Sequence, residues 1–143
     1  MHRIQLSNHT HYKIQHNTYI KMIEKILSEL GYSNSFVSMH FLTAPKITEL
    51  HQQYFYNKAP TDCITLPVDH EGESGLNVLG DGFLCLSYIK SNALYYGVTF
   101  KHEIVRCMCH CILHMIGYED KTPEQQKIMT EKENELLKKI NIQ

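Results

Sequence analysis

Apolar residues recur at helical spacing in several stretches of the chain, and turn-forming residues separate these stretches. The first stretch carries an aliphatic stripe: Ile20, Ile23, Ile26, Leu27 and Leu30. Such a stripe predicts an amphipathic helix from about residue 17 to residue 30, with Gly31 at its end. A second helix is predicted from Pro45 to about residue 54, because proline suits the first turn of a helix.

The second half of the chain predicts three more helices. Ser87 is a potential cap for a helix that Gly97 would end. A longer helix is expected over about residues 100 to 116. The last helix begins at a capping box with proline at its first helical position, residues 122–125, and runs to about residue 139.

Shorter apolar stretches that are rich in strand-forming residues predict strands. Four are expected, over residues 2–6, 36–42, 61–67 and 79–86. Pro67 is expected to close the third strand, and the polar stretch 69–77 is expected to be an exposed loop. This order predicts an α/β or α+β domain with a mixed sheet of about four strands and helices packed on it.

Composition limits the classes of protein to which the chain can belong. With 143 residues and 43% apolar residues, the chain suffices for one domain, residues 1–143, around one core. Lys and Arg number 14 and Asp and Glu number 15, so the net charge of −1 gives no general attraction to nucleic acid. The amino end has no signal-peptide pattern, and no stretch has the length of a membrane span. We therefore expect a cytoplasmic protein with no membrane partner.

Two histidines on the long predicted helix give the clearest chemical signal. His110 and His114 lie four residues apart, so both imidazoles leave the same face of a helix. Such a pair alone is often only a polar stripe, but Gly117 can turn the chain back and bring the Asp120 carboxylate to the same place. Two nitrogens and one oxygen with an open fourth position are typical of catalytic zinc. The sequence predicts one Zn²⁺ per chain at the end of a long helix, with these three ligands acting through a metal-activated water.

Three motifs, in order along the chain, resemble those of the YbeY family of bacterial endoribonucleases. Residues 110–120, H-C-I-L-H-M-I-G-Y-E-D, resemble the family motif H-G-x-L-H-L-x-G-Y-D-H. Residues 60–67, P-T-D-C-I-T-L-P, resemble P-T-D-V-L-S-F-P, and residues 79–81 match L-G-D. The resemblance implies a metal-dependent hydrolase that cleaves single-stranded RNA in 16S rRNA 3′ end maturation and ribosome quality control. Its expected partners are rRNA and the ribosomal subunit.

The chain departs from the family pattern at three positions. Asp120 stands where the family usually has a third histidine ligand, and Cys111 stands where it has glycine. Phe55 occupies the place of a family arginine that is thought to hold the scissile phosphate. A carboxylate still suits zinc but lowers the positive charge of the site. The missing arginine bears on the nuclease chemistry more than on metal binding.

Other polar residues could support such a site. Thr61, Asp62 and Asp81 are candidates to orient the histidines, since a metal-bound imidazole commonly donates its other N–H to a carboxylate or carbonyl. Thr and Asp near strand ends equally form turns and caps. Lys58 and Arg106 could contact RNA phosphates if they face the cleft, and each could equally be an ordinary surface charge.

Two other functions remain open. The spacing H-x-x-x-H-x-x-G-x-x-D is close to that of the metzincin zinc peptidases, but these enzymes need glutamate directly after the first histidine, where this chain has Cys111. A ribosome-assembly binding protein with little catalysis is compatible with Phe55 and with the nearly neutral charge. Cleavage of single-stranded or structured RNA by the pure protein would separate the endoribonuclease from the ribosome-assembly binding protein.

Overall fold

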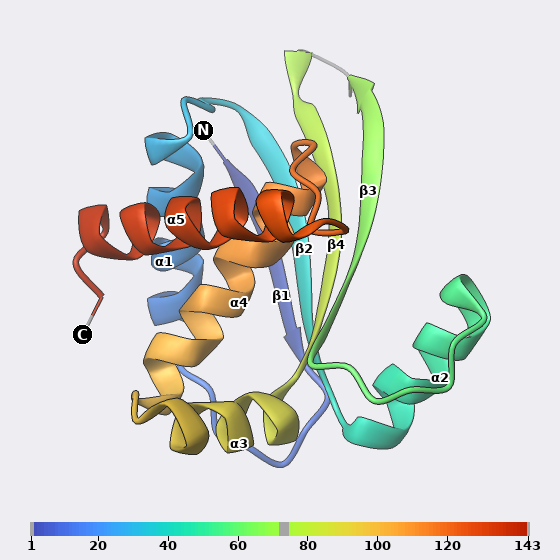
Figure 1. The fold of residues 1–143 in the computed structure, drawn as a ribbon. Helices are drawn as coiled ribbons and strands as arrows, with labels where there is room; N and C mark the ends of the chain where they lie inside the picture. Colours follow the sequence, from blue (N-terminus) through green and yellow to red (C-terminus); the bar gives the residue numbers. More distant parts are fainter. Residues whose placement is uncertain (1, 72–74, 143) are drawn as a thin grey trace.

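A four-stranded sheet runs through the molecule in the computed structural model, which describes residues 2–71 and 75–142 (Figure 1). The strands are β1 (Arg3–Asn8), β2 (Ser35–Leu42), β3 (Cys63–Glu71) and β4 (Asn77–Cys85). They lie in the order β1-β2-β4-β3, with β1, β2 and β4 parallel and β3 antiparallel to β4. The predicted mixed sheet of four strands is confirmed.

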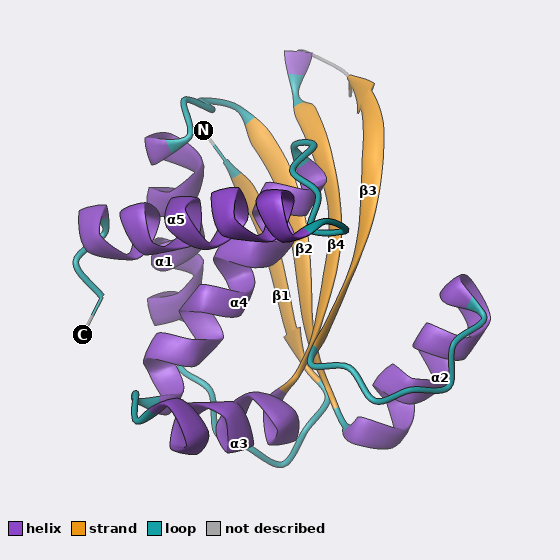
Figure 2. Cartoon of the chain, viewed as in Figure 1, coloured by secondary structure: helices purple, strands orange, loops and turns teal. Residues whose placement is uncertain are grey.

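Helices cover one face of this sheet and only part of the other. They are α1 (His16–Glu29), α2 (Ala44–Phe55), α3 (Leu86–Tyr96), α4 (Phe100–Met115) and α5 (Pro123–Lys139). Figure 2 shows α1, α4 and α5 on the same side of the sheet, while α2 stands apart beside the opposite side. The fold is therefore α+β, as predicted. Within the described part of the chain, no helix combines the length and the apolar character that a membrane crossing needs.

Helix α4 lies at the centre of the core. It contacts β3 and β4 on one side and α1, α3 and α5 on the others. Its residues Ile104, Met108 and Ile112 are fully buried in one cluster with Met39 and Phe41 of β2. Burial of each such side chain contributes roughly 1.5–3 kcal/mol to stability. This packing holds the histidine-bearing helix in a fixed position against the sheet.

The two faces of β4 have different neighbours. A Cβ atom at Gly82 would lie 2.6 Å from the Met39 sulfur and 3.3 Å from the Cys111 sulfur, so α4 approaches this point closely. Successive side chains of a strand point to opposite faces. Asp81 accordingly points away from α4, and its carboxylate lies 4.0 Å from Nε2 of His40 on the uncovered face.

Strand β3 is longer than the sequence predicted. Pro67 does not close it, and the strand continues to Glu71, so the first part of the stretch 69–77 is strand instead of loop. The prediction failed because β3 is an edge strand, where the missing N–H of proline need not break the ladder. A register shift follows Pro67. Residues 72–74 of the stretch lie outside the described residues.

Capping was predicted correctly for one helix and wrongly for another. At α5 the Thr122 hydroxyl accepts from the Gln125 N–H at 3.1 Å, and the Gln125 side chain accepts from the Thr122 N–H at 3.1 Å. Helix α3 instead begins at Leu86 with Cys85 as its N-cap and no side-chain cap. The prediction that Ser87 caps this helix is therefore wrong, because the helix starts directly from the end of β4.

Candidate metal centre

The last two turns of α4 present His110 and His114 on one face, as their spacing predicted. Their Nε2 atoms lie 3.1 Å apart. Gly117, with φ of 109°, then turns the chain out of the helix. In this turn the Gly117 N–H donates to the His114 carbonyl at 3.2 Å, and the Tyr118 N–H donates to the Leu113 carbonyl at 2.9 Å. These bonds satisfy carbonyls that a helix end otherwise leaves free, and they fix the path of the next residues.

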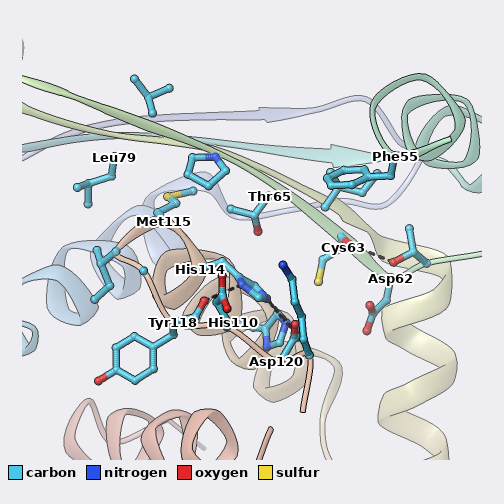
Figure 3. Close-up of a pocket in the computed structure, with 18 of the residues that line it drawn as sticks. Phe55, Asp62, Cys63, Thr65, Leu79, His110, His114, Met115, Tyr118 and Asp120 are labelled. Carbon is cyan, nitrogen blue, oxygen red and sulfur yellow. Dashed lines mark hydrogen bonds and ion pairs between the residues drawn. The ribbon is translucent and has the colours of Figure 1, made fainter. Parts of the chain in front are cut away.

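This turn brings Asp120 back to the histidines. Its Oδ2 atom lies 3.4 Å from Nε2 of His110 and 3.4 Å from Nε2 of His114 (Figure 3). The carboxylate of the neighbouring Glu119 accepts instead from the Gln125 side chain, at 3.5 Å. One ligand atom from each of the three residues lies within 4.8 Å of the others. The predicted ligand set is thus brought together.

The remaining ring nitrogens of both histidines already have partners. Nδ1 of His110 lies 2.7 Å from a Glu133 carboxylate oxygen, and Nδ1 of His114 lies 3.0 Å from the Tyr118 carbonyl oxygen. Because these oxygens accept hydrogen bonds, each Nδ1 must donate and carry the proton. In neutral rings both Nε2 atoms are then acceptors, and they face each other and the Asp120 carboxylate. Three acceptors that converge in this way need a positive charge among them, which a proton or a metal ion can supply.

The spacing of these three acceptors suits a small metal ion. Ligands held at roughly 2.0–2.2 Å from a tetrahedral zinc ion lie about 3.3 Å from one another. The corresponding distances here are 3.1 Å between the two nitrogens and 3.4 Å from each nitrogen to the carboxylate oxygen. Two imidazoles and one carboxylate are a donor set that zinc accepts, whereas magnesium prefers oxygen ligands. The residues present therefore fit a zinc-type ion with one position left open.

The surroundings of His110 favour positive charge at its ring, as a site for a cation should. Burial disfavours the positively charged ring, but the hydrogen bond and the charge of Glu133, with Asp120 nearby, outweigh burial. The pKa of His110 is consequently raised above its ordinary value. The surroundings of this imidazole stabilise positive charge, which can come from a proton or from a metal ion.

A cavity of about 1110 Å³ opens beside the three residues. One wall is the end of α4 with the turn after it, and another is β3, from which Cys63 and Thr65 project (Figure 3). Phe55, at the end of α2, lies on the far side and is 49% exposed. Pockets that hold small ligands usually measure about 300–1,000 Å³. This space can therefore admit a substrate segment larger than a single small molecule.

Thr61 and Asp62 line this cavity, but their hydrogen bonds go elsewhere. The Thr61 hydroxyl donates to the Cys63 carbonyl at 3.0 Å, and the Asp62 carboxylate accepts from the Asn92 side chain at 3.2 Å. The Nδ1 atoms of the two histidines bond instead to Glu133 and to the Tyr118 backbone carbonyl. Thr61 and Asp62 instead shape the start of β3. Their contacts fit the role of turn-forming residues better than that of partners of the histidines.

Three other candidates do not face the cavity. Asp81 lies on the face of the sheet opposite α4 and cannot orient the histidines. Side chains alternate along a strand, and on β4 it is Gly82 that faces α4. Lys58 is exposed in the segment after α2 and is not among the cavity-lining residues. The Arg106 guanidinium donates to Glu133 at 3.1 Å and to Asn134 at 3.0 Å, so it is directed toward α5.

Glu133 is the residue of this site that sequence reasoning missed. It is one of several acidic residues on α5, and helical spacing alone gives no reason to choose it. A signal was nevertheless present on α4, where Arg106 and His110 are four residues apart and share one face. A stripe with an arginine and a candidate ligand histidine calls for a carboxylate on the helix that packs against it.

Cys111, which replaces the family's glycine, is buried under β4. Its thiol hydrogen-bonds to that of Cys63, and this bond together with burial raises the pKa of the Cys63 thiol. The pair therefore packs α4 against β3 as thiols, next to the histidine side of the helix.

A family model agrees with the architecture and with the motifs. Residues 5–141 match the model described as Endoribonuclease YbeY. The chain belongs to the YbeY family of endoribonucleases. The resemblance seen in the three motifs is thereby confirmed over nearly the whole chain.

Individual relatives support the same assignment. An Endoribonuclease YbeY of Sulfurihydrogenibium is 33% identical over 118 residues, which cover 82% of this chain and 78% of the relative. The namesake from Chlorobium luteolum is 28% identical over 138 residues, 96% of this chain and 98% of the relative. The solution structure of TM1509 from Thermotoga maritima is similar with a TM-score of 0.60 and 27% identity, covering 99% of this chain and 92% of that one.

Proposed function

We propose that this protein is a zinc-dependent endoribonuclease that cleaves single-stranded RNA, acting in 3′ end maturation of 16S rRNA and in ribosome quality control. Its catalytic residues are His110, His114 and Asp120, which hold one Zn²⁺ per chain. Its substrate is rRNA associated with the ribosomal subunit, and its place of action is the cytoplasm. Membership in a family of endoribonucleases supports the reaction class.

One observation carries the proposal: three acceptor atoms converge at 3.1–3.4 Å while both Nδ1 atoms are already engaged. A structural polar cluster would satisfy its own donors and acceptors by hydrogen bonds. With both rings neutral, this cluster leaves its acceptors facing one another at the wall of a cavity. That arrangement suits a cation with an open position toward substrate.

The protein residues have distinct tasks in this reaction. A zinc ion, when bound, supplies Lewis acidity, which lowers the pKa of water toward about 7 and offsets negative charge on a phosphate. His110 and His114 present neutral Nε2 atoms, and Asp120 contributes one negative charge. The cavity beside them holds the RNA segment, with Phe55 opposite and Lys121 at the rim as the one Lys or Arg among the lining residues that the structure describes.

Cleavage assays on protein purified without a polyhistidine tag test the proposal. We expect wild-type protein with zinc to cut a single-stranded RNA and to leave the matching duplex intact, as the proposed specificity requires. A chelator should abolish cleavage, and zinc should restore it. His114→Ala should lose both zinc and cleavage, whereas His11→Ala, an exposed histidine outside the cavity lining, should keep both.

Phe55 favours one alternative, a ribosome-assembly binding protein in which catalysis is weak. Such a protein would bind zinc and RNA but would release the RNA uncut. Uncut single-stranded and structured RNA after incubation with fully zinc-loaded wild-type protein would therefore replace the nuclease proposal with the binding function.

A further inference from the structure

Glu133 joins α5 to the metal centre, although it stands 23 residues away from His110 in the sequence. Its side chain is only 8% exposed. One carboxylate oxygen lies 3.1 Å from the Arg106 guanidinium, and the other lies 2.7 Å from Nδ1 of His110. A buried carboxylate is costly unless its oxygens are paired, and here each oxygen has a different cationic or N–H partner.

A purely structural ion pair does not explain this arrangement. Arg106 alone would be served by a two-oxygen contact with the carboxylate, which is the common geometry of such pairs. Instead Arg106 divides its contacts among Glu133, Glu103 at 3.6 Å and Asn134, and Glu133 turns its second oxygen to the imidazole. The shortest of these contacts is the one to the histidine.

We propose that Glu133 is a positioning residue for the metal centre: it fixes the ring of His110, keeps the proton on Nδ1 and aims Nε2 at the ion, while Arg106 holds the other carboxylate oxygen by a hydrogen bond. This inference rests on the metal site of the proposed function. It assigns a part in the reaction to α5, a helix that contributes no ligand. A carboxylate behind a ligating imidazole also raises the basicity of that ligand and so strengthens metal binding.

The two histidines are held in different ways, which makes the role testable. His114 is oriented by the backbone carbonyl of Tyr118, which no side-chain substitution removes. His110 depends on a side chain. Changes at Glu133 should therefore weaken one ligand and leave the other two in place, so that metal binding is reduced and not abolished.

The test measures zinc affinity on metal-free protein by competition with a coloured chelator. Glu133→Gln keeps an acceptor oxygen but loses the charge, and Glu133→Met loses both. We expect zinc affinity to fall by roughly 10-to-100-fold for Glu133→Met and by less for Glu133→Gln. Glu131→Gln removes an exposed carboxylate from the same helix and should bind zinc like wild type. Visible absorption of bound Co²⁺ should change for both Glu133 variants and not for the control.

Folding is separated from positioning by unfolding the metal-free proteins. If Glu133→Met is too unstable to measure, Glu133→Gln carries the test, because it keeps the size of the side chain and one acceptor oxygen and should still bind zinc more weakly than wild type. Wild-type zinc affinity and an unchanged Co²⁺ spectrum in Glu133→Gln and Glu133→Met, with only their unfolding altered, would overturn the inference.

The outcome can be separated from that of the proposed function. Equal zinc affinity in all variants, with RNA cleavage by wild type intact, would refute the role of Glu133 alone. Weakened zinc binding in the Glu133 variants, with no RNA cleavage by wild type, would refute the nuclease and keep the positioning role. A wild-type protein that binds no zinc would refute both.

Discussion

At the scale of single residues, the site depends on where each side chain points and less on its distance in sequence. Asp120 is a ligand candidate because the turn at Gly117 aims its carboxylate between two Nε2 atoms, at 3.4 Å from each. Glu119, one residue earlier, also carries a carboxylate, but this carboxylate contacts Gln125. The turn, and not the type of side chain, therefore decides which of the two acids can contact an ion at the histidines.

We predict that Asp120→Ala loses zinc while Glu119→Ala retains it. Two imidazoles alone leave the ion with too few anchors, and zinc affinity should fall by at least about 10-to-100-fold, the loss that residues behind the ligands commonly cause. Asp120→His should keep zinc, since imidazole is an equally suitable ligand. Metal analysis of the three variants tests this prediction. Zinc loss in Glu119→Ala alone would show that Glu119, and not Asp120, is the third ligand.

Phe55 permits a second prediction at this scale. Phe55→Arg would place a cation in the cavity wall, so RNA should bind more tightly, with a lower KM and a steeper dependence on salt. Tyr54→Arg is the matched control, because Tyr54 is equally exposed at 49% on the same helix but does not line the cavity. Equal effects of both substitutions would show a general attraction to RNA and no role for position 55.

At the scale of elements, much of the fold was predictable because local patterns decide it. The capping box of α5 and the paired histidines of α4 act within one or two helical turns, and their outcome needs no other element. Asp81 and Glu133 could not be judged in this way. Which face of β4 meets α4, and which acid of α5 meets His110, are set by tertiary packing. The motif that contains Asp81 identified the family correctly. The prediction that Asp81 lies beside the histidines was wrong.

The glycine of that same motif, Gly80, allows a prediction for β3 and β4. Its φ is 149°, and a Cβ there would lie 2.5 Å from the backbone oxygen of Leu66. Gly80→Ala should lower the free energy of unfolding by about 1–3 kcal/mol, because the added Cβ would press on backbone atoms of β3 and the φ of 149° strains a residue with a Cβ. Gly97→Ala has a positive φ but nothing within 4 Å and should cost less. Urea unfolding measures both variants. An equal loss of unfolding free energy in the two would show that contact with β3 is not the cause.

At the scale of the whole molecule, the metal centre links elements that are far apart in the chain. The candidate ligands come from α4 and the turn after it, the carboxylate behind His110 comes from α5, and the opposite cavity wall comes from β3 and α2. Such a site exists only in the folded chain, so an ion that binds it must also stabilise the fold. The single domain over residues 1–143 stays a prediction.

Zinc should therefore raise the stability of the whole protein. At a free zinc concentration 100 times the dissociation constant, the free energy of unfolding should rise by about 2.7 kcal/mol, provided that the unfolded chain does not bind zinc. His114→Ala should show no such gain, while His11→Ala should show all of it. Thermal unfolding with zinc and with chelator measures this, and an equal gain in His114→Ala would place the stabilising ion at another site.

The most direct test of the account is the rate of RNA cleavage as zinc is added stepwise to metal-free protein. If His110, His114 and Asp120 form the catalytic metal centre, cleavage of single-stranded RNA should rise in proportion to bound zinc and stop rising at one ion per chain. Asp120→Ala should stay inactive over the same range. Full cleavage by metal-free wild type, or by zinc-free Asp120→Ala, would contradict the account.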